Sequence, residues 1–126
     1  MRVVFGASLA FFHGYGKVFG GKMPDFVKAV VALGFPAPTF FAWCAALSEL
    51  VGGALVALGL LTRPAAAFAG FTMVVALYRH RVDPFAKSEL AVLYLVVMIA
   101  CVVRGGGAYS LDNRGKRRSS LRRPTA

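Results

Sequence analysis

Acidic residues are scarce in this chain of 126 residues, which carries five Asp and Glu against fifteen Lys and Arg. Charged residues of both signs make up only 16% of the sequence, whereas a soluble domain averages about 25%. This shortage excludes an ordinary soluble globule. The chain also has just two cysteines and two histidines, with no Cys-x-x-Cys and no zinc-ligand spacing. The sequence therefore predicts no metal site.

Apolar residues are correspondingly abundant, at 58% of the sequence with a mean hydropathy of +0.66. The length leaves room for one domain, which we assign to residues 1–112. Residues 113–126 hold six basic residues, no acid and no aromatic, and are expected to form a disordered basic tail. Such a tail on an apolar body favours an anionic lipid surface over nucleic acid, whose binding needs basic residues spread among aromatics.

Four apolar stretches dominate the chain, at residues 3–19, 39–61, 65–78 and 90–103. A membrane span needs about 20 residues, and the second stretch meets this length unaided. The sequence thus predicts an all-α protein, an integral membrane four-helix bundle. Helical spacing of apolar residues over 25–33 further predicts a short interfacial helix between the first two spans.

The basic residues predict the orientation of these spans. With four spans, both termini lie on one side, together with nine basic residues; the opposite side holds five. The positive-inside rule then places both termini in the cytoplasm.

Three ionisable side chains lie well inside the first two predicted spans. At 1.5 Å of rise per residue, His13 lies about 16 Å from the inner face and Lys17 about 22 Å. Glu49 lies about 16 Å from the outer face of a core about 30 Å thick. Charges at such depths are costly and usually have partners inside a bundle. We therefore expect His13, Lys17 and Glu49 to lie close together.

Three further residues are expected to complete this cluster. Glu89 begins the fourth span at a height that Lys17 can reach. Tyr78 and His80 are expected near the opening of the cluster, in the outer half of the bundle. Two functions fit the cluster: an ion-pair network that only fixes helix register, or a site for a ligand, a quinone or protons. A third alternative is that the charged groups reach the membrane surface separately and never meet.

Neither the cysteines nor the glycines form a recognisable motif. Cys44 is expected near the outer face and Cys101 near the inner face, too far apart for a disulfide. The glycine-rich run at residues 14–20 departs from Gly-x-Gly-x-x-Gly and follows no strand, so it does not indicate a nucleotide site.

The order and spacing of several short motifs resemble the DoxX family over nearly all of residues 2–112. These motifs lie at residues 2–6, 13–17, 33–36, 49–53, 58–63, 89–94 and 107–112. The resemblance implies a small four-helix protein of the bacterial plasma membrane, in a family grouped with oxidoreductases. The family is named after a relative of the membrane subunit of an archaeal thiosulfate:quinone oxidoreductase. The resemblance also implies partners such as superoxide dismutase and a sulfurtransferase-like protein, in oxidative-stress defence.

These features lead to three functional hypotheses. The first is the membrane subunit of a thiol or sulfur redox complex that passes electrons toward quinone. In this hypothesis His13 and Glu49 are catalytic and handle protons, while Lys17 orients an anionic or quinone oxygen. Glu89, Tyr78 and His80 then help to bind the cofactor. The second is a non-enzymatic scaffold whose basic tail recruits a soluble partner, and the third is a small-molecule carrier, in which several copies assemble.

Overall fold

The computed structural model describes residues 1–115, apart from the Lys87 side chain, and these residues form helices without a strand. A first helical run comprises α1 (Arg2–Ser8), η1 (Leu9–Tyr15) and α2 (Gly16–Val18), and a second comprises α4 (Pro38–Leu47), η2 (Ser48–Gly52) and α5 (Gly53–Leu58). Between them lies α3 (Met23–Ala32); α6 (Thr62–Arg79) and α7 (Phe85–Arg104) follow. The all-α class is confirmed.

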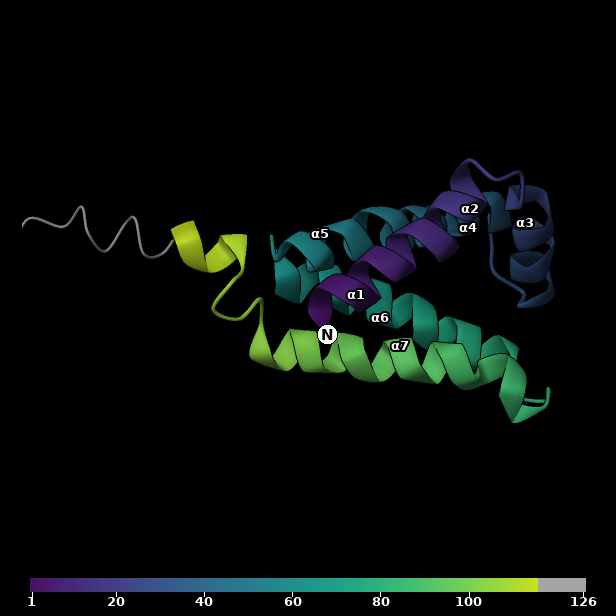
Figure 1. Ribbon diagram of the computed structural model, residues 1–126. Helices are drawn as coiled ribbons and strands as arrows, with labels where there is room; N and C mark the ends of the chain where they lie inside the picture. Colours follow the sequence, from purple (N-terminus) through teal and green to yellow (C-terminus); the bar gives the residue numbers. More distant parts are fainter. Residues whose placement is uncertain (116–126) are drawn as a thin grey trace, which may run out of the picture.

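Figure 1 shows the first two runs side by side above the α6–α7 pair, with α3 across one end. The two layers diverge toward the end where α3 lies. This short helix overlaps the one expected at residues 25–33, although its place at a membrane interface stays a prediction. The basic tail also stays a prediction, because residues 116–126 lie outside the described part.

Glycines bring the first two helical runs into close contact. A Cβ atom at Gly6 would lie 2.6 Å from the backbone nitrogen of Ala57, and one at Gly53 would lie 2.8 Å from that of Ala10. Gly14 likewise packs directly on Leu50. Small residues at such positions let helix backbones approach closely in lipid. The contact fixes how residues of the first run face those of the second.

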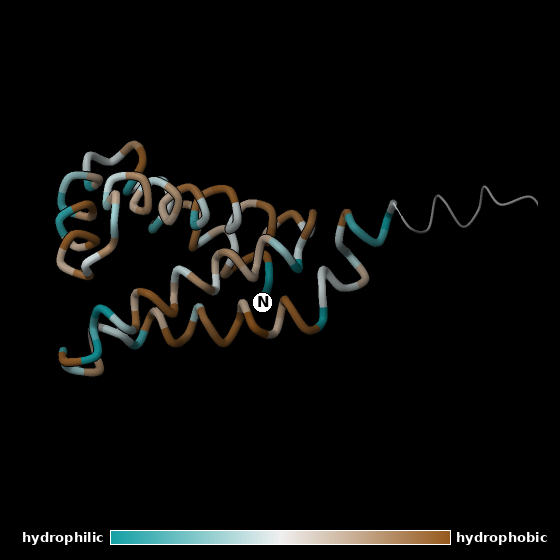
Figure 2. Tube along the Cα trace, turned by 180° about the vertical axis from the view of Figure 1, so that it is seen from behind, coloured by the Kyte–Doolittle hydropathy of each residue, from teal (hydrophilic) through white to brown (hydrophobic). Residues whose placement is uncertain are grey.

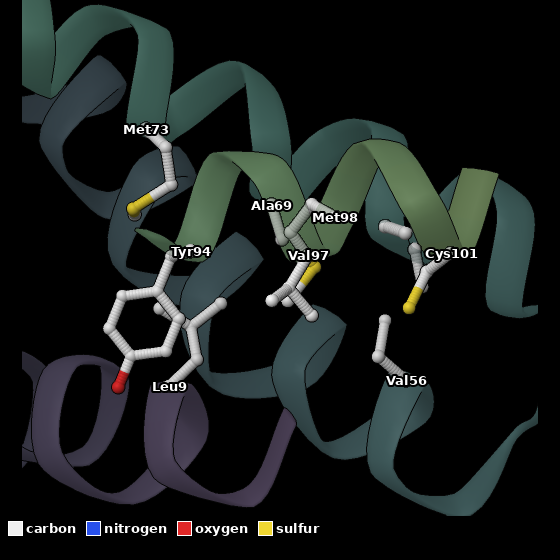
Figure 3. Close-up of a cluster of buried hydrophobic side chains, with 10 residues drawn as sticks. Leu9, Val56, Ala69, Met73, Tyr94, Val97, Met98 and Cys101 are labelled. Atoms are coloured by element: carbon white, nitrogen blue, oxygen red, sulfur yellow. The ribbon is translucent and has the colours of Figure 1, made fainter. Parts of the chain in front are cut away.

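The hydrophobic core lies between the two layers. Figure 3 shows Met98 and Cys101 of α7 packed near Val56 of α5 and Ala69 of α6. Tyr94 points from α7 toward the helix that carries Leu9. Its hydroxyl lies 2.6 Å from the Ser8 hydroxyl, so the core holds one satisfied polar contact.

The turn between α5 and α6 is held by a residue far along the chain. The Asp112 carboxylate accepts hydrogen bonds from the backbone N–H groups of Leu61 and Thr62, at 2.8 and 3.0 Å, and from the Thr62 hydroxyl at 2.9 Å. Leu61 has a left-handed backbone with φ of 47°, which is unfavourable for a non-glycine residue. Asp112 therefore stabilises a strained turn and caps α6.

Much of the outer surface is apolar. Large exposed side chains include Phe12, Phe68 and Phe71, which are 71%, 69% and 65% exposed. Figure 2 shows hydrophobic residues along the middle of the helices, with hydrophilic ones concentrated toward their ends. Soluble monomers rarely expose so much contiguous apolar surface. The surface is that of a protein associated with a membrane.

One helix in the described part of the chain is long and apolar enough to cross a bilayer by itself. It is the second run, Pro38–Leu58, with 21 residues and a mean hydropathy of 1.8. The first run, from Arg2 to Val18, is shorter. The four-span membrane bundle and the cytoplasmic position of both termini therefore stay predictions.

Candidate functional site

A buried ion pair joins the first two helical runs. Lys17 of α2 donates hydrogen bonds to both carboxylate oxygens of Glu49 in η2, at 2.8 Å and 2.6 Å. The Glu49 side chain is only 4% exposed and that of Lys17 is 20% exposed. The aromatic face of Phe26, from α3, lies 4.0 Å from the Lys17 ammonium. The Glu49 carboxylate and the Phe26 ring thus both contact the Lys17 ammonium, and both offset the free-energy cost of its desolvation.

His13 lies beside this pair without an ion-pair contact to it. Its ring packs edge-on against Tyr94 with a centroid separation of 5.2 Å and an interplanar angle of 80°. Tyr94 is itself held by Ser8. The packing gives the imidazole a defined orientation on the wall that it shares with Lys17 and Glu49.

Both proton-handling candidates lie in π-helical segments. His13 belongs to η1 and Glu49 to η2, and these two segments pack against each other. The π-helix is rare and occurs often at functional sites. Its wider turn changes which side chains point inward compared with an α-helix. The two π segments therefore set which residues of the first two runs face the interior.

A cavity of about 570 Å³ extends from this cluster between the diverging layers. Its polar wall contains the residues His13, Lys17, Ser48, Glu49, Thr72, Arg79 and His80. The remaining wall is mainly aromatic and aliphatic, and comes from α3, α4, α6 and α7. Several of these apolar lining residues, such as Phe68 and Phe71, are also exposed on the outer surface. The volume and lining suit a small apolar molecule with a few polar atoms.

The structure brings together four of the six residues that the sequence analysis selected. His13, Lys17, Glu49 and His80 all line the cavity. His80 also pairs with Asp83, with its Nδ1 atom 2.7 Å from a carboxylate oxygen.

The other two residues correct the expected cluster. Glu89 is exposed and Tyr78 is 58% exposed, and neither lines the cavity. Tyr78 instead stacks under the guanidinium of Arg81, at 4.2 Å from its ring centroid. Glu89 is five residues before the inward-facing Tyr94, which places it about 140° away around α7. Equal depth in the bundle therefore does not bring Glu89 to the cluster, because α7 turns its carboxylate toward the outside.

Three contributors to the site were missed from the sequence. Tyr94 occupies one of the matched motifs, but aromatic residues are too frequent here to single it out. Phe26 was recognised only as part of an apolar stripe. Ser48 belongs to no recognisable motif, yet it lines the cavity beside Glu49.

The two cysteines are free. Cys44 is exposed and lines the cavity, whereas Cys101 belongs to the core. Within residues 1–115, no three His, Cys, Asp or Glu side chains lie together in a way that could hold a metal ion.

The apolar surface, the long apolar helix and the buried ion pair beside a cavity define a helical membrane-associated protein with an internal site. The family model of DoxX matches residues 1–81, which cover both π segments and the Lys17–Glu49 pair. The chain belongs to the DoxX family, a membrane-associated family related to oxidoreductases. No curated protein and no solved structure matches it.

Proposed function

We propose that this protein is the membrane subunit of a thiol or sulfur redox complex and that its cavity binds quinone. The observation that carries the proposal is the Lys17–Glu49 pair in the wall of a mainly apolar cavity. Family membership supports a redox context. A quinone fits the lining because its ring needs apolar walls and its carbonyl oxygens need hydrogen-bond donors.

The polar wall supplies the groups that such a ligand requires. The Lys17 ammonium has three donor hydrogens, so it can bind a ligand oxygen while it remains paired with Glu49. A quinone takes up two electrons and two protons when it is reduced. Glu49 and His13 are the cavity residues suited to hold and transfer protons, since a carboxylate and an imidazole both act as general acids and bases.

The walls also suggest how the ligand enters. Phe68 and Phe71 line the cavity and at the same time face outward from α6. A lipid-soluble ligand could pass between these rings from the hydrocarbon region without crossing water. Electrons would come from thiols of a partner protein, whose oxidation to a disulfide releases two electrons and two protons.

Quinone binding to the purified protein tests the proposal. Trp43, the only tryptophan, precedes Cys44, which lines the cavity, but does not line the cavity itself. Only the saturable part of its fluorescence quenching is therefore assigned to a quinone bound in the cavity. We expect saturable quenching by a fully substituted benzoquinone. The Glu49→Gln variant should bind more weakly, because it alters the Lys17 position. Equal binding by Glu49→Gln and the unaltered protein would remove this site from the function.

A further inference from the structure

The short helix α3 faces the cavity with one side and the surroundings with the other. Its inner side has the spacing of one helical face, and its cavity-lining residues are Phe26, Ala29, Val30 and Leu33. The opposite side is exposed and carries the ion pair between Asp25 and Lys28. The helix packs mainly on α4, at the end where the two layers diverge (Figure 1). The attachment of α3 to the bundle thus rests on one apolar face.

A glycine with a left-handed backbone lies near each end of α3. Gly21 has φ of 71° and Gly34 has φ of 78°. A Cβ built at either position would meet nothing within 4 Å, so the surroundings of both residues are open. Glycine adopts either sign of φ at little cost, and a few residues at the ends of an element are the usual hinges of moving segments. Both connections therefore allow α3 to move as a unit.

One contact of α3 covers the cation of the buried pair. The Lys17 ammonium has three hydrogens, and it donates to both Glu49 oxygens, at 2.8 Å and 2.6 Å. The Phe26 ring centroid lies 4.0 Å from the same nitrogen, so the ring takes space beside the hydrogen that the carboxylate leaves over. A ligand oxygen must approach the nitrogen to about 3 Å to accept that hydrogen. The ring and a ligand oxygen therefore compete for one position on Lys17.

We propose that α3 is a lid that moves on the two glycines, and that Phe26 must leave Lys17 before a ligand oxygen can bind there. The inference rests on the proposed function, because the ligand is the quinone of the same cavity. It concerns access to the ammonium and leaves the entry between Phe68 and Phe71 as described. Only the fraction of molecules in which α3 has moved can bind an oxygen to Lys17, which weakens the apparent affinity.

The variant Phe26→Leu gives results of opposite sign for a lid and for a fixed wall. It keeps an apolar side chain but loses the cation–π contact. With a lid, it should bind tetramethyl-1,4-benzoquinone roughly two- to thirtyfold more tightly, the range for one such contact. Binding of 1,2,4,5-tetramethylbenzene, which has the same ring and methyl groups without oxygens, should not become tighter. A fixed wall that loses part of its ring should instead bind both compounds more weakly.

A second phenylalanine of the cavity wall supplies the matched control. Phe35 lines the same cavity, but its aromatic contact is with Phe41, at 5.2 Å between ring centroids. Phe35→Leu should therefore bind the quinone as tightly as the unaltered protein or more weakly. Quinone binding is followed by the saturable part of the Trp43 quenching, and hydrocarbon binding by its competition with the quinone.

Hydrogen exchange of α3 tests the movement in the unaltered protein. If the bound quinone displaces Phe26, the backbone amides of Met23–Ala32 should exchange faster at saturating quinone, because local opening becomes more frequent. A quinone that packs against a fixed wall should slow their exchange. Helix α6 is the internal reference, since its amides should not exchange faster. Without ligand, α3 should already exchange faster in Phe26→Leu than in the unaltered protein.

The possible results separate this inference from the proposed function. Tighter quinone binding by Phe26→Leu, with faster exchange of α3 in the presence of quinone, supports the lid. Equal or weaker quinone binding by Phe26→Leu, or slower exchange of α3 with quinone, overturns the lid and leaves the quinone site standing. If neither the unaltered protein nor Phe26→Leu binds either compound, the quinone site itself is wrong and the inference falls with it.

Discussion

Removing either partner of the Lys17–Glu49 pair should destabilise the fold, but by different amounts. Replacing Lys17 by Met leaves the Glu49 carboxylate, only 4% exposed, without its cation. Breaking a buried pair by removing one partner costs about 3–5 kcal/mol. Replacing Glu49 by Gln leaves a Lys17 side chain that is 20% exposed and can turn toward the surface. Its cost should be smaller, about 1–3 kcal/mol.

The double variant Lys17→Met, Glu49→Gln completes the test. With both charges removed, no uncompensated charge remains, so the double variant should be more stable than Lys17→Met alone. Thermal unfolding in a mild detergent measures all four proteins. A loss of 3 kcal/mol corresponds to a fall in Tm on the order of 10 °C. Equal losses for the two single variants, or a double loss equal to their sum, would refute the account of the buried pair.

Three further predictions follow from other contacts. Gly53→Ala places a Cβ 2.8 Å from the backbone of Ala10 and should lower the free energy of unfolding by about 1–3 kcal/mol. In the control Gly16→Ala, the new Cβ meets only the end of the Lys22 side chain at 3.9 Å, so stability should be unchanged or higher. A similar Tm for both variants contradicts the close helix contact. Asp112→Ala removes the cap of α6 and should cost about 0.5–2 kcal/mol, while Asp25→Ala, which loses only an exposed pair with Lys28, should leave Tm unchanged. Under native conditions N-ethylmaleimide should label the exposed Cys44 and spare the buried Cys101 until the protein is denatured, as mass spectrometry of the labelled protein can show; fast labelling of Cys101 would contradict the core packing.

Much of the helical order could be predicted from the sequence, because prolines and glycines mark the ends of the apolar stretches. Pro38 begins the second run, and α7 ends at Arg104, just before three glycines. The Asp112 cap could not be predicted, since it joins positions far apart in the sequence. Only the folded chain shows which turn that carboxylate reaches.

The part of the candidate site that depends only on the depth of each residue along its helix could be predicted from the sequence. Rise per residue placed His13, Lys17 and Glu49 near one height, and all three line one cavity. Rise alone does not fix helix rotation, so Glu89 was expected inside although it is exposed. The rise per residue also does not predict that Glu49 pairs with Lys17 while His13 packs against Tyr94. The π-helical segments locally change the direction in which side chains point around the helix, and no motif in the sequence predicts these segments.

Protection of Cys44 tests the central claim most directly, because this exposed thiol lines the cavity. The rate of its labelling by N-ethylmaleimide is measured with and without a fully substituted benzoquinone, which thiols do not readily attack. A quinone in the cavity should slow the labelling strongly in the unaltered protein and much less in Glu49→Gln. Labelling at the same rate with and without saturating quinone would contradict a quinone site beside the Lys17–Glu49 pair.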